Sequence, residues 1–115
     1  MTRAERLALA ARAEDADGAE TEAILREAAK LVLSDDLAIG SFVCKLGAEA
    51  YVDAALMLVP KHLFPRIYGE SGQVILVGWT DTVGWEEVAR SALCHSIALA
   101  IVAVCLRALA EECGE

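Results

Sequence analysis

Aromatic residues, prolines and phosphate-binding motifs are scarce or absent in this chain of 115 residues. Aromatic side chains make up only 5% of the sequence and there are two prolines, so alanine and leucine must fill most of the core. Such a composition favours close-packed helices over broad, aromatic-rich sheets. No Gly-x-Gly-x-x-Gly and no Gly-Lys-Ser/Thr segment occurs, which argues against a nucleotide-dependent enzyme.

Basic residues are also few compared with acidic ones. Ten lysines and arginines face 18 aspartates and glutamates, which gives a net charge of −8. Proteins that bind phosphate backbones need basic side chains, so the sequence predicts no direct nucleic-acid partner. The acids occur in runs no longer than two, as on a solvated surface rather than a DNA-mimicking face. With 57% apolar residues, the chain is long enough for a single domain over residues 1–115.

The four cysteines contain no Cys-x-x-Cys pair, and the charged first 30 residues do not resemble a signal peptide. We therefore expect reduced thiols in the core of a cytoplasmic protein. Cys94 and His95 are adjacent, but neighbours on a helix point about 100° apart and cannot share a proton. No usual ligand spacing occurs, so no catalytic, cofactor-binding or metal site is predicted, and the chain is expected not to be an enzyme.

The apolar run from Ala92 to Leu106 is 15 residues long, short of the ~20 that cross a bilayer. We expect it to form the middle of a long apolar helix from Trp85 to Glu112, and we expect no membrane association. Such a helix has more apolar surface than two strands can cover. The sequence therefore predicts a homodimer or larger oligomer with Ile97 and Ile101 at the interface, unless residues 35–60 cover this helix.

The remaining pattern predicts an α+β fold. Helices are expected at residues 2–14 and from about 17 to 32. Two β-rich runs, within about 62–79, are joined by a glycine-bounded turn and indicate an antiparallel hairpin. The expected architecture is a small antiparallel sheet sandwiched by helices, with Pro65 on an edge strand or at a bulge. Because two strands form a marginal sheet, a third is expected from residues 37–46 or from a partner chain.

Two segments leave alternatives open. Residues 37–47 contain two glycines and are read either as a loose helix begun by Asp35 or as an irregular strand. Asp53 is the only charge in the segment from Tyr51 to Pro60. It is interpreted as the N-cap of a short helix, with a catalytic carboxylate as the lesser alternative.

Trp79 and Trp85 flank a short polar loop that contains Asp81. Tryptophan is enriched among interface hot spots, so these three residues are the first candidates for binding a partner. The expected hairpin tip, with Tyr68 and Glu70, is the second candidate. The structural alternative is that each tryptophan closes one end of the core.

The segment Asp53-Ala54-Ala55-Leu56, followed by Leu58-Val59-Pro60 and by an Ala/Leu/Cys-rich terminal helix, resembles the phage ABA sandwich domain. This family of small proteins comes from tailed phages and prophages. The resemblance covers roughly residues 17–110 and implies an α-β-α sandwich with no assigned activity. Residues 35–48 depart from it, because a plainer and more polar loop is expected there.

Three functions follow as hypotheses. The first is a non-enzymatic phage or prophage accessory protein that binds a host or phage protein. Its most concrete form is a counter-defence, anti-CRISPR-type inhibitor of a host nucleic-acid-binding effector, because an acidic protein can complement a basic surface. The alternative is a self-assembling structural or morphogenesis component of the virion. A small hydrolase that uses Cys94 or Asp53 ranks last.

Overall fold

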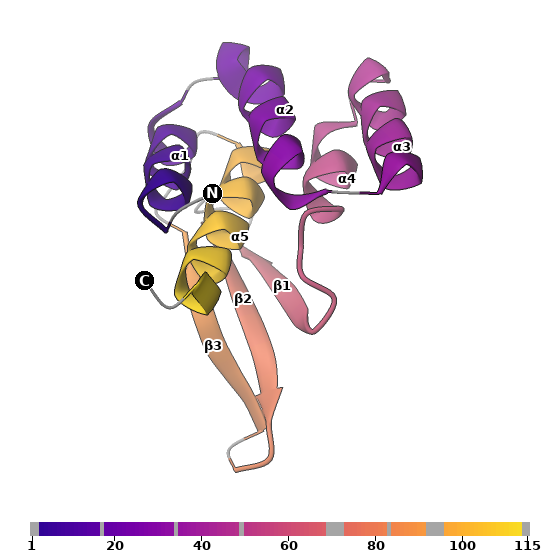
Figure 1. Ribbon diagram of the computed structural model, residues 1–115. Coiled ribbons are helices and arrows are strands. Elements are labelled where there is room, and N and C mark those ends of the chain that lie inside the picture. Colours follow the sequence, from indigo (N-terminus) through magenta and orange to yellow (C-terminus); the bar gives the residue numbers. More distant parts are fainter. Residues whose placement is uncertain are drawn as a thin grey trace.

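The computed structural model describes residues 3–16, 18–33, 35–48, 50–68, 73–82, 84–91 and 96–113 (Figure 1). In chain order, four α-helices come first, the three strands of one sheet follow, and a fifth α-helix comes last. The bounds are α1 (Arg3–Asp15), the 3₁₀ turn η1 (Gly18–Glu20), α2 (Thr21–Val32), α3 (Asp36–Gly47), α4 (Tyr51–Leu56), β1 (Leu63–Tyr68), β2 (Gln73–Thr80), β3 (Gly84–Arg90) and α5 (Ile97–Cys113).

Helix α5 is the central packing element. Every residue from Ala98 to Leu106 is buried, which places apolar side chains on all sides of the helix. Helices α1, α2 and α4 pack around it, and β2 and β3 pack against it from the sheet side (Figure 1). The α+β class, the small antiparallel sheet and the helices that pack on it are confirmed. The layers run from the sheet through α5 to the other helices, so α5 lies in the middle.

The predicted start of the C-terminal helix is wrong. Residues 84–90 form strand β3, and α5 begins only at Ile97. The three strands have the order β1-β2-β3, and both pairs are antiparallel. The third strand therefore comes neither from residues 37–46 nor from a partner chain. The pair Glu86-Glu87 looks like the acidic first turn of a helix, but β2 offers a free edge with which this segment pairs.

Two local features shape β3. Its register against β2 shifts by one residue between Leu76 and Val77, which leaves Val88 as the extra residue of a bulge. Beyond the strand, the backbone N–H of Ser91 donates to the Val74 carbonyl at 2.9 Å. The Ser91 hydroxyl in turn accepts the Val74 N–H at 3.0 Å. Ser91 is buried, and its side chain therefore continues the ladder by one step past the end of β3.

The structure decides between the open alternatives in the first half. Residues 36–47 are helical, and the Asp35 side chain accepts the Leu37 N–H at 3.1 Å as the N-cap of α3. The N-cap of α4 is Ala50, so the assignment of Asp53 as N-cap is wrong. Asp53 is exposed in the first turn of α4, where the helix dipole favours a carboxylate. Pro65 lies on the edge strand β1, as predicted.

The reasoning that led to a dimer through α5 does not hold in this fold. Ile101 has 0% exposure within a single chain, and Ile97 is partly buried against the same core. The cover comes from α1, α2, α4 and the third strand, of which only α4 lies in the segment 35–60 named in advance. Neither isoleucine is free to form an interface between two copies.

Candidate functional site

The two faces of the sheet differ in what they contact. Leu63, Val74 and Leu76 point into the main core beneath α5. Since side chains alternate along a strand, Phe64, Val77 and Trp79 point to the opposite, outer face. The described helices pack only on the core face, so the outer face is the part of the sheet available to a partner.

Three aromatic side chains gather on this outer face, one from each strand. Trp79 and Trp85 are register partners across β2 and β3, and their ring centroids lie 5.4 Å apart at an interplanar angle of 76°. The Phe64 ring, from β1, lies 5.1 Å from Trp85 at 89°. Both pairs are edge-to-face, the arrangement that the ring quadrupoles favour. We call Phe64, Trp79 and Trp85 the aromatic cluster.

The aromatic cluster is exposed although its rings are in mutual contact. Phe64, Trp79 and Trp85 are 53%, 62% and 49% exposed, in contrast to the largely buried core. Exposed apolar residues are ordinary when single, but three in contact form a patch of the kind that marks interaction sites. Because Trp79 and Trp85 are largely exposed, neither closes an end of the core, as the structural alternative would require.

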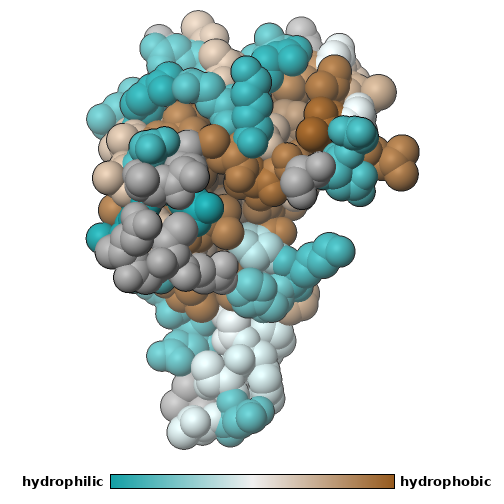
Figure 2. Space-filling view, in the orientation of Figure 1, coloured by the Kyte–Doolittle hydropathy of each residue, from teal (hydrophilic) through white to brown (hydrophobic). Residues whose placement is uncertain are grey.

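The turn between β2 and β3 holds the two tryptophans in register. Gly84 has a φ of +79°, a left-handed conformation that glycine adopts without steric cost. The Thr80 hydroxyl donates to the Gly84 carbonyl at 3.1 Å and closes the turn. Asp81 is exposed beside it. The ends of β2 and β3 extend beyond the helices in Figure 1, and their surface in Figure 2 is pale to teal rather than brown.

The charges near the aromatic cluster are mostly negative. The sequence from Val77 to Glu87 contains three acids and no lysine or arginine. We call this segment the ribbon end. Arg90 follows this segment in the sequence and donates two hydrogen bonds to Glu87, of 2.6 and 3.2 Å. These bonds lower the pKa of Glu87 below its ordinary value.

The structure unites only part of the candidate site predicted from the sequence. Trp79, Asp81 and Trp85 lie together at the ribbon end. Tyr68 ends β1 opposite Gln73, at the other end of the sheet from Leu63. Five residues of strand separate these ends, which is about 17 Å. Glu70 lies outside the described residues. Tyr68 and the tryptophans therefore do not form one patch.

Phe64 is the member of the aromatic cluster that sequence reasoning missed. A signal for it was present in the predicted hairpin. A four-residue turn between residues 68 and 73 pairs Phe64 with Val77, which is the observed register. Val77 is two residues before Trp79 and shares its face, so the same register would have placed Phe64 beside the tryptophans.

Two observations concern metal and thiol chemistry in the part of the chain that the structure describes. Those residues contain no group of three or more His, Cys, Asp or Glu side chains able to hold a metal ion. Cys44 is exposed, and burial raises the pKa of the Cys105 thiol to about 12, so Cys105 is not a nucleophile at neutral pH. Cys94 and His95 lie outside the described residues.

No family model matches the chain, and no curated protein or solved structure shows a significant match to it. The described helices are also too short or too polar for any of them to cross a membrane.

Proposed function

We propose that this protein acts without catalysis, by binding another protein through the aromatic cluster and the acidic ribbon end. The observation that carries the proposal is the edge-to-face contact of Phe64, Trp79 and Trp85 on an uncovered sheet face. Large, rigid aromatic side chains bury much area and lose little side-chain entropy, which is why they dominate interface energetics.

The partner surface that fits is basic and partly apolar. Three acids and no lysine or arginine accompany the tryptophans in the ribbon end, and the whole chain carries −8. Lysine and arginine side chains of a partner would stack on the exposed indole faces and pair with the nearby carboxylates. Nucleic-acid-binding effectors present such surfaces, because they must neutralise phosphates.

The most concrete form of this function is a phage or prophage counter-defence inhibitor of a host nucleic-acid-binding effector, of the anti-CRISPR type. It combines the acidic ribbon end with the phage origin that the resemblance implies. The alternative is a self-assembling structural component, in which the same face would meet a second copy. The inhibitor hypothesis implies a location in the host-cell cytoplasm.

A pull-down from host lysate, read by mass spectrometry, tests the proposal. The baits are the unaltered protein, a Trp79→Ala/Trp85→Ala double variant and a Leu37→Ala control. Leu37 is 84% exposed on α3. Its replacement therefore also removes exposed apolar surface, but far from the sheet. Circular dichroism should show that all three are folded.

We expect the unaltered protein and the Leu37→Ala control to retain the same partner and the double variant to lose it. Rising salt should slow association, since exposed charges are screened beyond about 8 Å at physiological ionic strength. A nuclease effector among the retained proteins would support the inhibitor, and capsid or tail proteins would support assembly. Equal retention by all three baits would place the binding surface elsewhere and overturn the proposal.

A further inference from the structure

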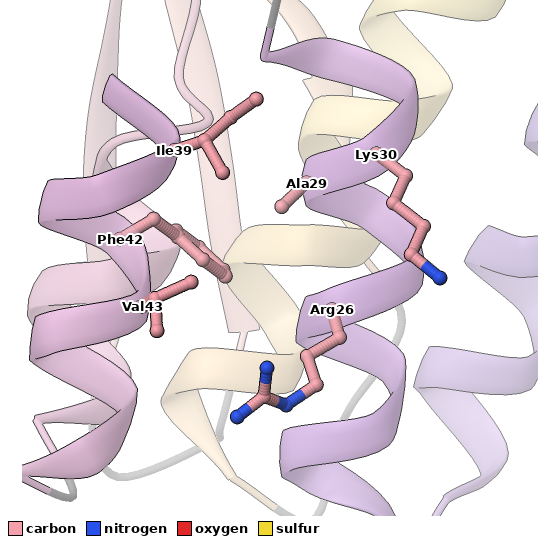
Figure 3. Close-up of a pocket in the computed structure, with 6 residues that line it drawn as sticks. All are labelled: Arg26, Ala29, Lys30, Ile39, Phe42 and Val43. Atoms are coloured by element: carbon pink, nitrogen blue, oxygen red, sulfur yellow. The ribbon is translucent and has the colours of Figure 1, made fainter. Parts of the chain in front are cut away.

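A groove between α2 and α3 is lined mostly by apolar side chains, which come chiefly from α3. Its volume is 210 Å³, and Ala29, Ile39, Phe42 and Val43 form most of its surface (Figure 3). Phe42 is 1% exposed and forms the floor, whereas Ile39 and Val43 are 38% and 44% exposed at the mouth. The groove is built by these two helices alone, so it is independent of the aromatic cluster on the sheet.

The size of the groove limits what it can hold. Pockets for drug-sized ligands usually enclose about 300–1,000 Å³, so this one is small. A volume of 210 Å³ therefore suits one unbranched alkyl chain rather than a drug-sized ligand.

A cation stands at the groove of an otherwise acidic protein. The Arg26 side chain extends from α2 into the space between the helices, whereas the Lys30 side chain, one turn further along, points away from α3 (Figure 3). Arg26 contacts Glu22 at 3.5 Å, the outer limit of a hydrogen bond, and its side chain is 50% exposed. A guanidinium has five N–H donors, so Arg26 can receive a second carboxylate while it keeps this contact.

We propose that this groove binds a free medium-chain carboxylate, with the alkyl chain against Phe42 and the carboxylate on Arg26. An uncharged chain would gain only the apolar contact, and a cationic amphiphile would meet Arg26 with like charge. Charge complementarity therefore selects the head group, and the small volume limits the chain length.

Octanoate is the probe, because it joins a carboxylate to one unbranched alkyl chain. Methyl NMR of the folded protein should show saturable shifts at Ile39 and Val43, with a Kd near ~1 mM. Octanol and octyltrimethylammonium should bind more weakly than octanoate. Within the carboxylate series, affinity should fall about fourfold for each methylene removed.

Three variants locate the site, and two matched variants control for it. Arg26→Gln should weaken octanoate roughly 3- to 10-fold. Val43→Gln should abolish saturable binding. Glu22→Gln removes the competing carboxylate and should tighten binding roughly 2- to 5-fold. The controls are Arg66→Gln and Val88→Gln on the sheet, where the first makes the same charge change and the second alters a valine of equal exposure (43%).

The gain expected for Glu22→Gln guards against variants that simply lose their fold. Equal affinity for octanol or for octyltrimethylammonium would overturn the proposal, because Arg26 would then select nothing. Shifts confined to the aromatic cluster, or no saturable shift with octanoate, would also overturn it. Equal losses in the groove variants and the sheet controls would have the same meaning.

Discussion

Arg107 of α5 forms a two-point ion pair with Glu14 of α1, although 93 residues separate them in the sequence. The carboxylate is the more enclosed partner, because its side chain is 9% exposed and that of Arg107 is 34% exposed. Two residues further along α5, the Leu109 carbonyl accepts a hydrogen bond from Arg6 at 2.9 Å. Polar contacts thus line the long seam along which the first helix meets the last.

Arg107→Ala should destabilise the protein by about 2–3 kcal/mol, because it leaves the Glu14 carboxylate enclosed without its cation. The matched control is Arg12→Ala, which removes the Arg12–Glu27 pair of α1 and α2 at 2.9 Å. Both of its side chains are about half exposed, at 56% and 47%. Urea denaturation should show a much smaller loss for the control. Equal losses would mean that the enclosure of Glu14 has no energetic consequence.

Cys44 and Cys105 should react very differently with thiol reagents. In a Cys94→Ser/Cys113→Ser background, Cys44 should be alkylated in the folded protein, because it is exposed. Cys105 should react only after denaturation, because it is buried and its pKa is raised to about 12. Denatured unaltered protein should show four free thiols without reductant, and two or fewer would contradict the expectation of reduced cysteines.

The same thiol predicts a pH dependence of stability. Above pH 9 the unfolded chain loses the Cys105 proton while the folded protein keeps it, so the folded state binds more protons. Stability should therefore fall as the pH rises from about 9 toward 12, by up to about 4 kcal/mol if the full shift is realised. Cys105→Ala should flatten this part of the profile relative to the unaltered protein, and a slope unchanged by the substitution would refute this assignment.

Two glycines should respond with opposite sign to alanine. Gly84→Ala forces a side chain into a left-handed conformation and should cost about 1–2 kcal/mol. Gly40→Ala lies within α3, where nothing lies within 4 Å of the added Cβ, and should stabilise by about 0.5–1 kcal/mol. Thermal unfolding measures both. A loss at Gly40 would show that α3 does not hold its helical conformation in solution.

The aromatic cluster should be centred on Trp85. Its ring contacts both Phe64 and Trp79, so it is the ring that the two aromatic pairs share. Each edge-to-face pair contributes about 0.5–1.5 kcal/mol beyond area burial, so Trp85→Ala should destabilise more than Trp79→Ala. A double-mutant cycle on Phe64 and Trp85 should give a coupling of this size, and zero coupling would mean that the rings do not pack in solution.

Local patterns predicted the hairpin, because a glycine-bounded turn between two β-rich runs leaves few alternatives. They failed at residues 84–90, where Glu86 and Glu87 favour a helix start but pairing with β2 decides the outcome. Residues 84–90 themselves carry no sign that β2 has an open edge with which they can pair. This is a tertiary effect, of the kind that overrides local propensity.

The candidate site was predicted in part for the same reason. Trp79 and Trp85 lie six residues apart, so a loop between them was enough to suggest a common location. Phe64 reaches them only through the sheet. The α2–α3 groove had no sequence signal at all, because it depends on how far apart two helices lie rather than on any motif.

The seam between α1 and α5 has a consequence for how the chain acquires its fold. Arg3 and Glu111 lie 3.1 Å apart, and both helices lie side by side in Figure 1. During synthesis, α5 is made long after α1. The buried face of α1 (Leu9, Ala10 and Ala13) therefore lacks its main packing partner until α5 has been synthesised. Contacts between such distant segments slow folding and leave apolar surface exposed in the meantime. Folding on the ribosome is thus expected to finish with the docking of the first helix.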